Sequence, residues 1–243
     1  MNINDFVRSN LAAQYLGKGV SAQAAFRVDA PVQSALGRAD KRIQSQVDTT
    51  TTQLSSMGKL KSAVAGIQTA STNLENLGKD TTVASEKASV SSFVSAFNDA
   101  IKTAKTTAET PGEVLAANSA IRAGKDLQQS VGSDAKTLES LKKLGIAQNT
   151  DGTLSLDSKK FDAAQKADAA GTRETLTSIG KDVKSAAGRE LANSGNVGLS
   201  MSYLSQRTNV LKAQQSMLGQ YGQDSKVVPN TGSNPAFNFG SYT

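Results

Sequence analysis

One segment of this sequence has residue types and spacing that could do chemistry, and it reads N-T-D-G-T-L-S-L-D from Asn149 onward. Asn149, Asp151 and Gly152 match the middle of an EF-hand loop, in which carboxylate and carbonyl oxygens surround a calcium ion. The first ligand of such a loop would fall on Ala147 and the twelfth on Ser158, so the opening Asp and the closing Glu are missing. We therefore predict a turn followed by a helix cap, and no metal.

Two further patterns resemble chemical motifs by spacing alone. The spacing S-x-x-K, in which a lysine could activate a serine one helical turn away, begins at Ser56, Ser133 and Ser178. Composition explains three copies in a chain rich in Ser and Lys, and no S-D-N or K-T-G partner accompanies them. The spacing G-x-G-x-x-A begins at Gly17, but no strand precedes it as dinucleotide binding requires. We expect no catalytic residue and no cofactor.

Composition and charge exclude several classes of protein. Cysteine and histidine are both absent, which removes disulfides, thiolate nucleophiles, most zinc sites and the usual general base, so we expect no enzyme. The net charge of +6 is scattered along helical segments, which favours a solvated surface over a nucleic-acid partner. No apolar run reaches the roughly 18 residues of a membrane span. Asp5 and Arg8 interrupt the N-terminal stretch, so we also expect no classical signal peptide.

Apolar spacing predicts one very long helix. Apolar residues recur every three, four or seven positions from Leu36 to Leu77, and Pro31 suits the first turn of such a helix. At about 1.5 Å per residue the helix would be roughly 60 Å long and would need a partner along its length. An ordinary core helix and a coiled-coil-like assembly rod are both open interpretations.

Two more helical patterns follow a stop at Gly78. The stretch after Gly78 is interpreted as a linker, and helical spacing resumes over residues 89–108 and again over 113–130. The buried side of the second pattern is expected to consist of Val114, Leu115, Ile121 and Leu127.

The apolar period then changes to two, which predicts a small β-hairpin near 146–156. Asp157 is placed to cap the next helix. A helical stripe over 176–183 follows, and a last one over 199–221 is expected to pack along the long first helix.

These patterns predict a mainly α fold. We expect an elongated helical bundle or coiled-coil-like leg with a small β-hairpin and flexible termini. The predicted organisation is a flexible N-terminal segment at 1–30, a helical leg-like domain at 31–222 and a flexible tail at 223–243.

Three ordered runs resemble the flagellar hook-associated protein 2 family, the filament cap proteins. The first run begins at Lys41 and contains Q-L-S-S-M-G-K-L-K-S-A-V-A-G-I-Q, similar to the family's Q-x-S-x-x-G-x-L-K-S-A-L-x-x-F-Q. The second begins at Val90 and reads V-S-S-F-V-S-A-F-N, where the family has V-x-x-F-V-x-A-Y-N. The third begins at Leu141 and matches L-x-x-L-G-I-x-x-x-x-D-G-T-L-x-L-D. The resemblance covers residues 35–165 well and the last helix loosely.

This resemblance implies a non-enzymatic structural protein of the bacterial flagellum that serves cell motility. It further implies an extracellular place, export by the flagellar type III route, a coiled-coil-like homo-oligomer, and flagellin or other flagellar axial proteins as partners, without nucleic acid or membrane. Family members carry β-rich head domains between the first helix and the F-V-x-A-Y-N helix. Only residues 78–89 stand there in this sequence, so it resembles a reduced form that lacks the heads.

We expect one apolar stripe and two aromatic anchors to make the interactions with partners. These candidate interaction residues are Leu54, Leu60, Val64, Ile67, Leu74, Phe93 and Phe97. Two alternatives stay open. One is a cytoplasmic helical adaptor or regulator derived from the same scaffold, and the other is a helical protein drawn to nucleic acid by its positive charge.

Overall fold

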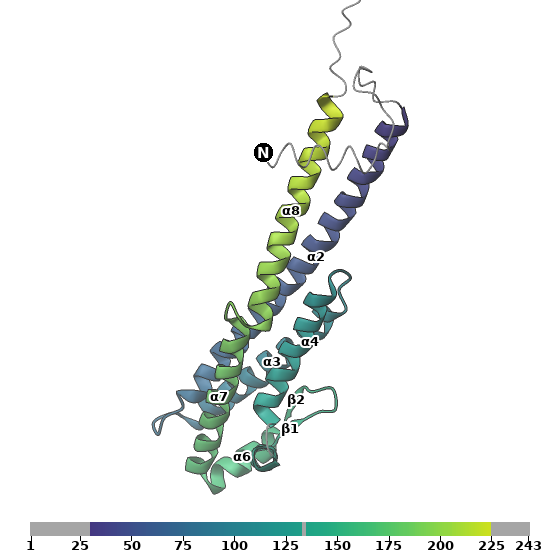
Figure 1. Cartoon of the computed structure of the whole chain (residues 1–243). Helices are drawn as coiled ribbons and strands as arrows, with labels where there is room; N and C mark the ends of the chain where they lie inside the picture. The colour runs from purple at the N-terminus through teal and green to yellow at the C-terminus, as the bar shows by residue number, and fades with distance from the viewer. Residues whose placement is uncertain (1–29, 133–134, 225–243) are drawn as a thin grey trace, which may run out of the picture. The chain divides into compact units, whose positions relative to one another are not determined.

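The computed structural model describes residues 30–132 and 135–224. Seven α-helices and one two-stranded antiparallel sheet make up this part of the chain, which confirms the predicted mainly α fold and its hairpin (Figure 1). The elements are α2 (Ala30–Glu75), α3 (Val83–Ala108), α4 (Val114–Gly132), α5 (Ala135–Lys143), β1 (Ile146–Gln148), β2 (Leu154–Leu156), α6 (Ser158–Ala167), α7 (Ala169–Leu191) and α8 (Asn196–Asp224). Apart from their innermost residues, the termini predicted to be flexible lie outside the described residues.

The chain divides into two compact units. The first unit contains the start of α2 up to Ile43 and the end of α8 from Ala213. Leu36 and Leu218 are half-buried in the first unit. The second unit, Gln44–Lys212, contains the hydrophobic core and every site described below.

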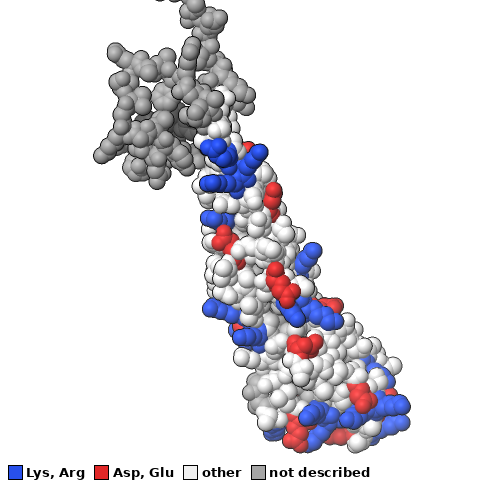
Figure 2. Space-filling model, turned by 90° about the vertical axis from the view of Figure 1, so that its right-hand side faces the viewer, with Lys and Arg blue, Asp and Glu red and all other residues white. Residues whose placement is uncertain are grey.

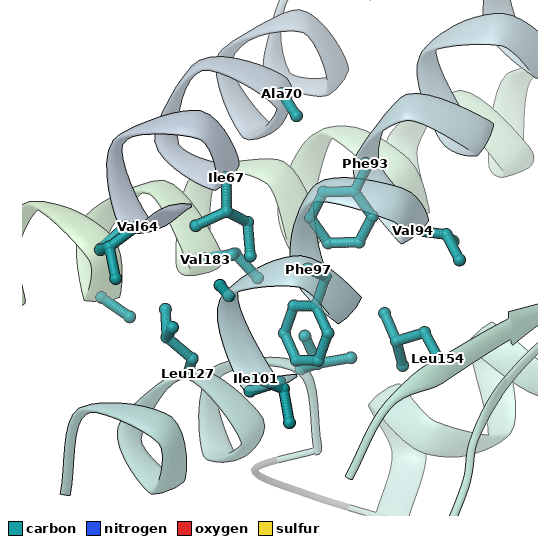
Figure 3. Packing of buried hydrophobic residues seen from close by; sticks show 14 of the residues in the cluster. Val64, Ile67, Ala70, Phe93, Val94, Phe97, Ile101, Leu127, Leu154 and Val183 are labelled. Carbon is teal, nitrogen blue, oxygen red and sulfur yellow. The ribbon is translucent and has the colours of Figure 1, made fainter. Parts of the chain in front are cut away.

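The predicted long helix is confirmed as α2, which runs from Ala30 to Glu75. Its buried side chains recur at three, four or seven residues and so lie on one face, as helical periodicity requires. Figure 3 shows Val64 and Ile67 of this face meeting Phe93 and Phe97 of α3 in one cluster. The hydrophobic residues of α2 with no exposed surface are Met57, Leu60, Val64, Ile67 and Leu74.

The helix that follows α2, α3, begins earlier than the sequence predicts. It starts at Val83 because the side chain of Thr82 accepts a hydrogen bond from the N–H of Ser85 and caps the helix. Most of the stretch interpreted as a linker is therefore the first turns of α3. Residues 76–82 alone join α2 to α3, so the chain has no head domain between these two helices.

The buried face predicted for α4 is largely wrong. Val114, Leu115 and Ile121 are exposed by 72%, 53% and 45%, and only Leu127 of the predicted set is buried. Small side chains take the inner positions on α4 and on the facing α3, which lets the two helices approach closely. The buried alanines are Ala100, Ala104, Ala116, Ala120 and Ala123.

A similar correction applies to α8. The predicted stripe contains residues from two faces, because Leu204 and Leu211 are buried whereas Leu199 and Val210 are exposed by 56% and 53%. The prediction that this helix packs along α2 is confirmed within the second unit. Ser45, Gln46, Thr49 and Thr50 of α2 line one small hollow of about 180 Å³ together with Arg207 of α8.

The hairpin pairs Ile146 with Leu156 and Gln148 with Leu154. Gly145, with φ of +77°, turns the chain from α5 into β1, a backbone conformation that costs glycine little. The predicted cap is confirmed, because the Asp157 carboxylate accepts the N–H groups of Lys159 and Lys160 at the start of α6. The hairpin thus leads directly into a capped helix.

Candidate functional site

The structure places the predicted interaction residues inside the chain's own core. Six of them are at most 1% exposed, and Leu54 is half-buried against the same core. The rings of Phe93 and Phe97 lie 6.1 Å apart between centroids. These side chains hold the helices of the second unit together, and their contact with a partner stays a prediction. The six are Leu60, Val64, Ile67, Leu74, Phe93 and Phe97.

The second and third of the three ordered runs meet through Asn98. Its Nδ2 donates to the Leu154 carbonyl at 2.8 Å, and the Leu154 N–H donates to Asn98 Oδ1 at 2.7 Å. The side-chain amide therefore pairs with both main-chain groups of one strand residue, as a neighbouring strand would. We call this arrangement an amide clamp, and it fastens the hairpin to α3.

A second amide clamp joins the first run to the turn before α4. Gln53 Nε2 donates to the Glu113 carbonyl at 2.9 Å, and the Glu113 N–H donates to Gln53 Oε1 at 2.8 Å. Gln53 is only 1% exposed. Gly112 leaves room for this clamp, because a Cβ at that position would lie 2.5 Å from Gln53 Oε1.

The side chain of Glu113 extends the second clamp to α8. Its Oε1 lies 3.1 Å from Arg207 Nε in an ion pair, and its Oε2 accepts a hydrogen bond from Tyr203 Oη at 3.3 Å. Both charged groups are partly exposed, so solvent screens the pair and its net stabilisation is small. Glu113 thus connects α2, α4 and α8, its main chain through the clamp and its side chain through the ion pair.

The segment that resembles a calcium loop is held as a turn by its own side chains. Asp151 Oδ1 accepts hydrogen bonds from the Thr153 hydroxyl at 2.6 Å and the Thr153 N–H at 3.0 Å. These two bonds lower the pKa of Asp151 from its ordinary value of 3.8. Over residues 30–132 and 135–224, no group of three or more carboxylates is placed to hold a metal ion.

The serines of the S-x-x-K spacings are placed differently from one another. Ser56 Oγ accepts a hydrogen bond from Thr110 Oγ1 at 3.2 Å, which links α2 to the end of α3. Ser178 is exposed on α7, and Ser133 lies outside the described residues. Of the two described serines, Ser56 therefore joins neighbouring segments and Ser178 faces solvent.

A buried carboxylate lies where α7 gives way to α8. Glu190 is 4% exposed, and Asn196 Nδ2 donates to its two oxygens at 3.1 and 3.0 Å. The same Nδ2 lies 3.4 Å from Asp126 Oδ2 on α4. Burial, with Asp126 nearby, raises the pKa of Glu190.

Sequence reasoning missed the two clamping amides, although both stand inside the ordered runs. Gln53 lies four residues before Met57 and seven before Leu60, which puts a polar side chain on the buried stripe. A buried amide needs hydrogen-bond partners, so a glutamine on the apolar stripe indicates a specific polar contact inside the fold. Its partner, Glu113, is 60 residues away, and no local pattern identifies it.

The fold and the clamps define a helical structural module whose short segments are fastened by side-chain amides. The family model of the flagellar hook-associated protein 2 C-terminus matches residues 23–226, and the chain belongs to this family of flagellar structural proteins. The resemblance of the three runs is thereby confirmed. No curated protein and no solved structure matches the chain. Among the described helices, none combines the length and apolar character that crossing a bilayer requires.

Proposed function

We propose that the chain is a non-enzymatic assembly protein of the bacterial flagellum that packs its helices against copies of itself and against axial proteins such as flagellin. The family match over residues 23–226 carries this proposal. No head domain separates α2 from α3, and in this proposal the helical module makes contacts with partners. Residues 31–222 act as the leg-like domain in this proposal.

The outer face of α8 supplies a surface for such contacts. Leu199 and Val210 are eleven residues apart, so they lie about 20° apart around the helix axis. Val197 and Leu204 lie on a different face of α8, and both are fully buried. The part of α8 that belongs to the second unit therefore has large apolar side chains on two faces, and the described residues bury one of these faces.

The start of α4 adds to the exposed apolar surface of the second unit. Val114 is the most exposed large apolar side chain, at 72%, and Leu115 follows it at 53%. Burial of such side chains against a partner contributes about 25 cal/mol per Å² of apolar surface removed from water. Helices that present this surface suit the packing of subunits along a filament.

Fractionation of cells tests the proposal. The protein should be found in purified flagella or in the medium of cells that have the flagellar type III export apparatus, and it should stay in the cytoplasm of cells that lack it. A cytoplasmic marker protein controls for lysis. Export at normal levels without the apparatus contradicts the proposed route, and retention in the cytoplasm of both strains supports the adaptor alternative.

A further inference from the structure

The solvent-facing side of the hairpin carries a hollow of about 390 Å³. Gly145, Ala147 and Ser155 form a floor of small residues, and Lys142 of α5 and Lys160 of α6 stand beside it. A volume of this size accommodates one or two side chains of a partner.

Strand alternation places this floor on the outer face of the hairpin. Ala147 pairs with Ser155 in the register, and their neighbours Ile146 and Leu154 are buried on the opposite face. A Cβ built at Gly145 would lie 2.9 Å from Lys160 Cβ, so the stem of this lysine starts directly at the floor.

The lining of the hollow carries two lysines against one carboxylate, a net positive charge. Lys142 and Lys160 are exposed, and neither has an ion-pair partner within residues 30–132 and 135–224. The one acidic residue of the lining, Asp157, already caps α6 through its Oδ1. Figure 2 shows Lys and Arg side chains low in the view, with Asp and Glu side chains among them.

Leu156, which also lines the hollow, uses neither of its main-chain groups in the ladder with β1. The Asp157 N–H donates to the Gly145 carbonyl and the Asn149 N–H to the Thr153 carbonyl, so Leu156 directs its N–H and carbonyl away from β1. Asn98 occupies the corresponding groups of Leu154. This edge of β2 is the one along which α3 lies, so a partner of the hollow meets the outer face of the hairpin and not its edge.

We propose that this hollow binds carboxylate side chains of an acidic segment of a protein partner. Ammonium groups from two helices attract carboxylates, and the floor of small residues leaves room for the side chains that carry them. A nucleic-acid strand is a poorer fit, because no aromatic side chain lines the hollow to stack a base.

Fluorescence anisotropy with the full chain tests the site. The probe is a fluorescein-labelled peptide of alternating Glu and Gly, and the same peptide with Gln in place of Glu is the uncharged control. The double variant Lys142→Gln/Lys160→Gln should bind the acidic probe at least about tenfold more weakly. The matched variant Lys61→Gln/Lys125→Gln removes the same charge from exposed positions on α2 and α4 and should change affinity by less than about threefold.

A variant that keeps the charge separates shape from electrostatics. Ser155→Trp fills the hollow from an exposed strand position and should also weaken binding, with an unchanged circular dichroism spectrum as proof of folding. Three results would overturn the proposal. These are no binding of the acidic probe, equal losses in the two double lysine variants, and displacement of the probe by oligothymidylate or inorganic phosphate more readily than by unlabelled peptide.

Discussion

The inner stripe of α2, the buried face that contains Leu60 and Ile67, and the outer face of α8 both carry large apolar side chains at helical spacing, yet they have opposite surroundings. Leu60 and Ile67 on the stripe have no exposed surface, whereas Leu199 and Val210 keep 56% and 53% of theirs. Periodicity predicts that residues share a helix face, and it does not say whether the same chain covers that face. In this protein the stripe builds the core, and the outer face of α8 stays exposed among the described residues.

The two amide clamps extend this contrast to polar side chains. Gln53 is buried on the inner stripe and holds the turn before α4 at Glu113. The side chain of Glu113 in turn pairs with Arg207 of α8. Asn98 is half-buried and holds a hairpin strand at Leu154. Without cysteine, the chain has no disulfide to fasten these segments, and two pairs of hydrogen bonds serve instead.

The largest effect is expected from a charge on the inner stripe. Ile67→Asp should lower the free energy of unfolding by about 4 kcal/mol or more, because an unpaired charge would be buried in the core. Urea unfolding followed by circular dichroism measures this change. Thr69→Asp, two residues away on an exposed position of α2, is the control and should have little effect. Equal stability of the two variants would show that Ile67 does not lie on the buried face of α2.

Removing each amide clamp in turn compares how much the two clamps contribute to the free energy of unfolding. Gln53→Leu should cost about 3 kcal/mol and Asn98→Leu about 2 kcal/mol, since each leaves a main-chain N–H and carbonyl without partners and Gln53 is the more buried. The same unfolding measurement applies, with the exposed Gln46→Leu as control. The reverse order would mean that water replaces the Gln53 contacts.

The ion pair between Arg207 and Glu113 should contribute much less than the clamps. A double-mutant cycle with Arg207→Gln and Glu113→Gln should give a coupling energy below about 1 kcal/mol, because both side chains are partly exposed. The coupling should fall further as salt is added. A coupling energy of several kcal/mol that does not change with salt would contradict this prediction and show that the ion pair is shielded from solvent.

The buried Glu190 should give the smallest effect, a pH dependence with a defined sign. Its folded-state pKa is raised above the ordinary value of 4.5, so the folded chain binds this proton more tightly than the unfolded chain. Stability should therefore fall as pH rises from about 4.5 through the folded pKa. Glu190→Gln should flatten the curve of unfolding free energy against pH in this window. An unchanged curve would contradict the assignment.

The sequence was sufficient to predict the elements that depend on local signals. The long α2, the hairpin and the Asp157 cap each follow from periodicity or from a turn and cap residue close in sequence. The inner face of α4 was not predictable in this way, because alanines and not its larger Val114 face α3. The partner of Gln53 depends on how three helices meet, which no local pattern encodes.

The central claim is that the inner stripe stabilises the chain and the outer face of α8 engages an axial partner. The direct test is co-sedimentation of the wild-type chain and of the double variant Leu199→Glu/Val210→Glu with purified flagella, together with their melting temperatures. We predict that the wild-type chain sediments with flagella and that the variant does not, although both melt within about 2 °C of each other because the changed positions are exposed. Equal sedimentation of the two proteins, or no sedimentation of the wild type, would contradict the claim.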